Sequence, residues 1–203
     1  MILSSLVSYY DRLHEGGKVP DFGFSIEDIG FAVKIDRQGN LVGEPLDLRT
    51  KVNANYFEYK SSIVPYTNEV NARSSNAAKI ANFIVDKVDY VFGMSGKSEK
   101  PTHHQSFNSL IEEVCPKTDD EGILAVKAFL EKWNPEDSVD FPLWKEMSGP
   151  NGKWVGFQLE GENRFIHERP AVKECWANYL AERVAKEHKN GISLVDGRPS
   201  PIQ

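Results

Sequence analysis

The chain has 203 residues, of which 40% are hydrophobic and 27% charged, and its formal net charge is −6. No run approaches the ~18 apolar residues of a membrane span, which excludes a transmembrane protein. The acidic balance argues against a stand-alone nucleic-acid binder, which is usually basic. The first ten residues lack a basic n-region, and the two cysteines are too few for a disulfide framework or a four-cysteine zinc site, so a reducing cytoplasm is expected.

The N-terminal third predicts one helix followed by strands. Apolar residues recur at three- and four-residue spacing over 2–15, which predicts an amphipathic helix. Residues 31–35 alternate between apolar and polar or small side chains, as in a half-buried strand. A turn at 38–40 and a return strand from 41–42 would complete a hairpin. A further strand is expected at 56–64.

The middle of the chain predicts a loop and three helices. Residues 65–76 are rich in Asn and Ser, whose side chains compete with helix for backbone hydrogen bonds, so a loop is expected. An apolar stripe predicts a helix over 77–92, ended by a glycine. A second helix is expected over 103–114. A third begins near Asp119 and Asp120, whose carboxylates suit a helix N-terminus.

The C-terminal part adds a second hairpin and a long helix. Residues 154–159 alternate like a strand, and 164–167 would return after a turn. Pro170 occupies the expected first position of a helix running to about residue 188. The fold class is therefore α+β, with short antiparallel β-hairpins packed with four or five α-helices. Three regions are expected: an N-terminal hairpin, loop and helix region, a helical region with a hairpin in the same domain, and the start of a further region (1–96, 97–191 and 192–203).

The segment from 49 to 79 is positive within an acidic chain, with five basic and two acidic residues. Ordinary fluctuation of surface charge would also explain this excess. The functional interpretation is a DNA-contact loop at 60–79. Free backbone N–H groups before a helix and the helix dipole favour phosphate, and Asn side chains can pair with base edges. Lysines can neutralise phosphate. The alternative is a capped helix with a solvated loop.

Other chemical signals are weak. His103 and His104 are adjacent, so they diverge on a helix and no third ligand completes a metal site. Cys115 and Cys175 are expected to act as small hydrophobes. The stretch 93–98 is similar to the tail of a phosphate-binding loop, but it follows a helix rather than a strand. We therefore expect no metal, no cofactor and no catalytic residue.

Several stretches along the chain share the pattern of one known family: Asn71 to Ser75, Ala81 to Asp86, Tyr90 to Gly93, Leu130 to Trp133, 141–147, His167 to Ala171 and 194–202. With these stretches the chain resembles the Csd1-type large subunit of the subtype I-C CRISPR Cascade surveillance complex. The resemblance runs in order along the chain, and no single motif decides it. Family members are several hundred residues long, so the chain is expected to be an N-terminal fragment.

The resemblance implies a non-catalytic, cytoplasmic protein of a bacterium. Such a subunit recognises the protospacer-adjacent motif (PAM) in double-stranded DNA, helps to start the R-loop, and leads to recruitment of a separate helicase-nuclease. Its implied partners are target DNA, the guide-RNA 5′ handle, and the pseudoknot-type and backbone Cascade subunits, with no membrane. A viral anti-CRISPR inhibitor is a further partner that the resemblance allows. Pairing with the guide reads the sequence in such systems, so the protein needs few groove contacts.

The predicted DNA-binding residues follow from the loop and the resemblance together. Those placed near the motif duplex are Asn71, Arg73, Ser74, Ser75 and Asn76. Lys60, Lys79 and Asn82 are expected as phosphate contacts or as residues behind those contacts. The alternative is a scaffold that grips the pseudoknot subunit and the guide handle while the motif is read elsewhere. A hydrolase or nuclease would need clustered carboxylates for a divalent ion, which the sequence does not support.

Overall fold

The computed structural model describes residues 2–16, 19–53, 56–67, 69–70, 80–187, 189–192 and 199–202. Four of its helices have twelve residues or more: α1 (Ile2–Glu15), α3 (Pro101–Val114), α4 (Glu121–Lys132) and α6 (Pro170–Glu187). Shorter helical turns are α2 (Val88–Val91), η2 (Pro135–Asp140), α5 (Trp144–Met147) and η3 (Ile166–Glu168). The α+β class is confirmed.

The main sheet is built around the long strand β1 (Phe24–Ile35). Strand β5 (Lys60–Pro65) pairs antiparallel with its first half, and β8 (Trp154–Leu159) pairs parallel with its second half. The short β2 (Leu46–Asp47) pairs with β1 as well. Three two-stranded pairs complete the described strands: β3 (Thr50–Lys51) with β4 (Phe57–Glu58), β6 (Met94–Ser95) with β7 (Ser98–Glu99), and β9 (Lys189–Ile192) with β10 (Pro199–Ile202).

The two expected hairpins are present only as remnants. Leu41 returns to Ile35 through a single bridge, and Phe165 returns to Gln158 in the same way. On the edge of β1 that Leu41 contacts, the short β2 pairs with Phe31 and Ala32, and β8 pairs with the opposite edge. The central parallel pair was not predicted.

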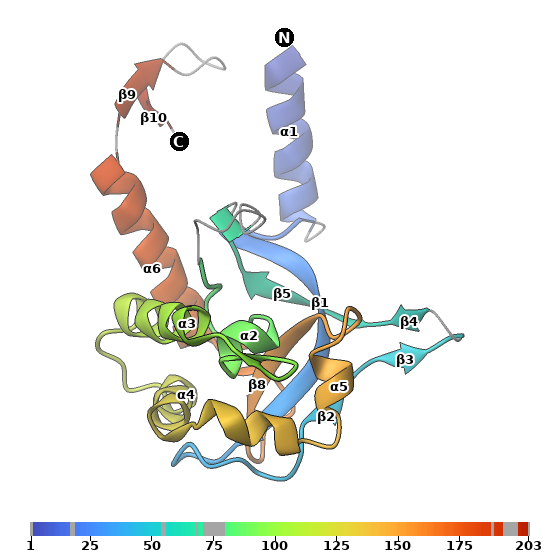
Figure 1. Ribbon diagram of the computed structural model, residues 1–203. Helices are drawn as coiled ribbons and strands as arrows, with labels where there is room; N and C mark the ends of the chain where they lie inside the picture. The colour runs from blue at the N-terminus through green and yellow to red at the C-terminus, as the bar shows by residue number, and fades with distance from the viewer. Residues whose placement is uncertain are drawn as a thin grey trace.

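One large core joins the two regions that the sequence divides near residue 96. Phe31 and Phe83 from the first region pack in the same buried cluster as Phe107, Phe157 and Trp176 from the second. Figure 1 shows α2, α3 and α4 beside the sheet, and α1 extending away from it. The expected apolar face of α1 is exposed, with Ile2 and Leu6 at 79% and 57%.

The turn after β1 is fixed by side-chain hydrogen bonds and a glycine. Asp36 accepts from the backbone N–H groups of Gln38 and Asn40, at 2.9 and 2.8 Å, and these bonds and one from the Asn40 side chain lower its pKa. Gly39 has a φ of +80°, and a Cβ placed there would lie 2.3 Å from the backbone nitrogen of Phe129 in α4. The turn therefore packs directly against a helix backbone.

We expect Gly39→Ala to destabilise the protein by about 3–5 kcal/mol, since it adds a backbone clash to the strain of a positive φ. Gly43→Ala is the matched control. Gly43 has a φ of +70°, but an added Cβ would meet no other atom within 4 Å, so only the strain of about 1–2 kcal/mol should remain. Urea unfolding measures both. Equal losses would contradict the contact with α4.

Candidate nucleic-acid interface

The predicted DNA-binding residues fall into two groups in the structure. Six of them lie outside the described residues: Asn71, Arg73, Ser74, Ser75, Asn76 and Lys79. Lys60 is exposed at the start of β5, whereas Asn82 is 1% exposed. Direct contact between Asn82 and a phosphate is therefore excluded in this conformation. Asn82 keeps the other expected role, that of a residue that supports the side chains in contact with DNA.

Asn82 holds together the two ends of the predicted loop. Its side-chain Nδ2 donates to the carbonyl oxygen of Pro65 at 2.7 Å and to that of Val85 at 2.9 Å. Pro65 ends β5, so the chain leaves the sheet and comes back at one fixed point. A buried amide with these two acceptors can fix the loop ends with little freedom.

The residues from 80 to 87 are not helical, contrary to the sequence-based expectation. Asp86 is fully buried and accepts from the backbone N–H groups of Asn82 at 2.6 Å and Lys87 at 2.7 Å. Ile84 has a positive φ of 63°. All six residues from 81 to 86 are buried. An amphipathic helix buries one stripe and not every residue, so a folded turn replaces it.

Two helices contact the described flanks of the loop. Arg183 of α6 donates to both carboxylate oxygens of Glu69, at 2.8 and 3.2 Å, and this lowers the pKa of Glu69. Ser106 of α3 accepts from the backbone N–H of Ala81 at 3.3 Å. The loop is therefore supported at its start by α6 and at its return by α3.

Lys60 and a second lysine, which the sequence did not single out, act on the same buried histidine. The Lys60 ammonium lies 4.8 Å from the ring centroid of Phe165, which stacks on the ring of His167. Burial, together with the positive charges of Lys173 and Lys60, lowers the pKa of His167 to about 3. Both lysines therefore act on one buried imidazole. Lys173 is remote in sequence, so no local signal could have placed it here.

A serine, a histidine and a glutamate meet between β5 and η3. The Ser62 hydroxyl donates to Glu168 Oε1 at 3.0 Å and lies 3.0 Å from His167 Nε2. The other carboxylate oxygen of Glu168 accepts from the backbone N–H of Phe165. The carboxylate thus contacts the serine and does not orient the imidazole, unlike the acid of a catalytic triad. The cluster joins β5 to η3.

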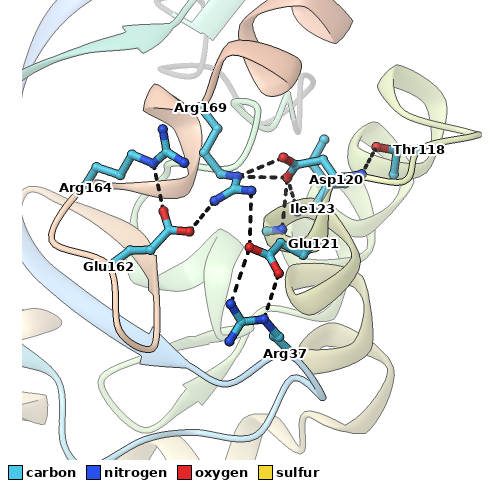
Figure 2. A network of polar contacts seen from close by, with 9 residues as sticks. Arg37, Thr118, Asp120, Glu121, Ile123, Glu162, Arg164 and Arg169 are labelled. Carbon is cyan, nitrogen blue, oxygen red and sulfur yellow. Dashed lines mark hydrogen bonds and ion pairs between the residues drawn. The ribbon is translucent and has the colours of Figure 1, made fainter.

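A larger polar network surrounds Arg169, directly after η3 (Figure 2). Its guanidinium Nε binds Asp120 at 2.8 Å, its Nη1 binds Glu162, and Glu121 lies 3.7 Å from its Nη2. Asp120 also accepts from two backbone N–H groups at the start of α4, as the sequence predicted for a helix cap. Every charge here has an opposite partner, so the network connects α4 to the junction before α6.

Arg49 belongs to the positive segment but is not available for phosphate. Its side chain is 4% exposed and forms two 2.8 Å bonds to Asp47. The guanidinium lies between the rings of Phe31 and Phe57, at 4.5 and 4.7 Å from their centroids. Arg49 therefore adds no free positive charge for a phosphate.

The described fold is an α+β domain in which β5 leads into one loop and α3 and α6 contact the described flanks of that loop. The sequence profile of the family described as CRISPR-associated protein (Cas_Csd1) matches residues 6–203, and the chain belongs to this family. The family resemblance predicted from the sequence is thus confirmed, and membership gives the chain a CRISPR Cascade context. No curated protein matches the chain.

The described residues offer neither a membrane span nor a metal centre. No described helix has the length and apolar character needed to cross a membrane. In the same part of the chain, no three His, Cys, Asp or Glu side chains gather as potential metal ligands.

Proposed function

We propose that the chain recognises the protospacer-adjacent motif in double-stranded DNA and helps to start the R-loop, as a non-catalytic subunit of a type I-C Cascade complex. The observation that supports this most is the fixed base of the 65–82 loop, at which the buried Asn82 amide joins Pro65 to Val85. A reader of base edges must present its side chains in a defined register. A loop fixed at both ends meets that requirement.

Lys60 is an exposed cation at the start of β5, the strand that leads into the loop. Contacts of lysine with phosphate add affinity without sequence information. The acidic body of the chain limits its affinity alone, so the other subunits, the guide RNA 5′ handle and base pairing provide the remaining binding energy. In this proposal, the docked complex recruits a separate helicase-nuclease, and the chain itself cleaves nothing.

A gel shift with the assembled guide complex tests this function. Duplex targets with and without the motif are compared at one fixed salt concentration for the wild type, Asn71→Ala and Arg73→Ala. We expect each variant to lose motif discrimination by about 1–3 kcal/mol for a base contact removed. Lys60→Ala should weaken both duplexes equally and reduce the dependence of affinity on salt.

Arg164→Ala is the control, because Arg164 is an exposed arginine away from the loop that pairs with Glu162 at 2.7 Å. It should change neither affinity nor discrimination. If Asn71→Ala and Arg73→Ala behave like this control, the motif is read elsewhere. The scaffold function, in which the chain contacts the pseudoknot subunit and the guide handle, would then replace the proposal.

A further inference from the structure

Strand β1 has one edge that is paired over only part of its length. At Ile29 the strand contacts both neighbours, because Ile29 pairs with Lys60 of β5 on one edge and with Trp154 of β8 on the other. Pairing with β8 starts there and continues toward Ile35. Within the described residues, the edge of β1 from 24 to 28 opposite β5 therefore has no partner strand.

The hydrogen-bond register shows which backbone groups face that edge. Tyr66 N–H donates to Gly23 C=O at 2.8 Å, which makes Gly23 and Tyr66 a hydrogen-bonded pair. Such pairs alternate along an antiparallel ladder, so Ser25 and Glu27 bond to β5. Ile26 therefore directs its backbone N–H and C=O away from β5. The backbone N–H of Asp28 points in the same direction.

These groups face a cleft of about 580 Å³. Residues 87–89, 95, 147–150 and 153–154 form its other walls, with Trp154 at the point where β8 begins. The cleft contains the carboxylates of Glu27, Asp28 and Asp89 against the ammonium groups of Lys87 and Lys153. An excess of carboxylates repels phosphate, so a nucleic acid does not suit this cleft.

The side chains next to the open edge are apolar and exposed. Ile26 is 55% exposed, and its cross-strand partner Ile63 of β5 is 43% exposed. Neighbouring side chains on one face of a sheet stabilise each other across strands. A strand added at this edge would place a side chain beside Ile26 and extend the row that Ile63 begins.

We propose that this edge of β1 binds an extended segment of another protein subunit of the Cascade complex as an added strand. The segment bonds to the backbone of Ile26 and Asp28 and places an apolar side chain beside Ile26. An extended peptide is the occupant because its backbone alone repeats donors and acceptors at the spacing of a strand edge. The choice of a Cascade subunit as the partner rests on the family to which the chain belongs. It does not rest on motif reading by the 65–82 loop.

Proline substitutions test the proposal, because proline removes one backbone N–H. Ile26→Pro removes the N–H that faces the cleft and leaves the bonds of Ser25 and Glu27 to β5 in place. Ile63→Pro is the matched control. Ile63 is the cross-strand partner of Ile26, and its N–H points away from β1, so the substitution removes no bond between β1 and β5 and no group at the open edge. Each variant is titrated with the purified remaining Cascade subunits and guide RNA, and assembly is measured by mass photometry.

We expect Ile26→Pro to weaken assembly at least tenfold and Ile63→Pro to change it less than twofold, with similar melting temperatures. Hydrogen exchange on the wild-type chain is the second measurement, in which the amides of Ile26 and Asp28 should slow at least tenfold on assembly. Equal assembly of both variants, or unchanged exchange of these amides, would overturn the proposal. Weaker DNA binding with normal assembly would also overturn it and assign the edge to nucleic acid.

The result is distinguishable from a failure of motif reading. Arg73→Ala should assemble normally whether or not it discriminates the motif. Complexes that do form with Ile26→Pro should keep the motif discrimination of the wild type.

Discussion

Arg169→Ala is expected to lower the free energy of unfolding by about 3–5 kcal/mol, because it leaves carboxylates without their cation in a buried place. The side chains of Arg169 and Asp120 are 10% and 8% exposed, and Glu162 binds the same guanidinium. Asp120 also caps α4. The substitution therefore disturbs the start of α4, the turn before η3 and the start of α6 together (Figure 2).

Urea unfolding followed by circular dichroism measures this loss, and Arg164→Ala is its matched control. Arg164 binds the same Glu162 at 2.7 Å, but its side chain is 50% exposed. Exposed ion pairs contribute less than about 1 kcal/mol, so the control should be nearly silent. Similar losses for the two arginines would show that burial of the network contributes little.

Asn82→Ala is expected to destabilise the protein by about 2–4 kcal/mol, because the carbonyl groups of Pro65 and Val85 lose their donor in a buried place. The loop between them would also lose its common anchor. In the assembled complex, we therefore expect weaker discrimination between duplexes with and without the motif. The loss of stability is measured by urea unfolding, and the loss of discrimination by gel shift.

Asn134→Ala provides the comparison for Asn82→Ala. Asn134 donates to Asp137 at 2.9 Å in an exposed pair, so its removal should cost less than about 1 kcal/mol. If a folded Asn82→Ala variant keeps full motif discrimination, the hydrogen bonds of Asn82 are not needed for reading DNA.

Local patterns predicted the elements that depend on local contacts. The period of apolar residues placed the helix at 103–114, and Asp120 caps the next helix as its position suggested. The segment 77–92 has the same period, but in its described part the burial of residues 81–86 and the bonds of Asp86 give a turn before the short helix Val88–Val91. A period of apolar residues does not distinguish one buried face from complete burial.

The candidate site was predicted only where its residues are close in sequence. Charge and composition indicate the loop and Lys60, whereas only the fold shows that Arg183 of α6 reaches Glu69 at the start of the loop. Arg49 was counted with the positive residues, yet two rings and Asp47 enclose it. Contacts between residues far apart in the sequence decide these positions. The pattern of a single sequence does not show which distant residues meet.

The parallel pair of β1 with β8 has a consequence for synthesis of the protein on the ribosome. Residues 29–35 emerge early, and their partners at 154–159 emerge only after α3 and α4 have been made. Contacts so distant in sequence form late and slow the folding rate. The nascent chain therefore keeps a hydrophobic strand edge exposed until residues 154–159 have been made, the period in which aggregation or a chaperone competes with folding.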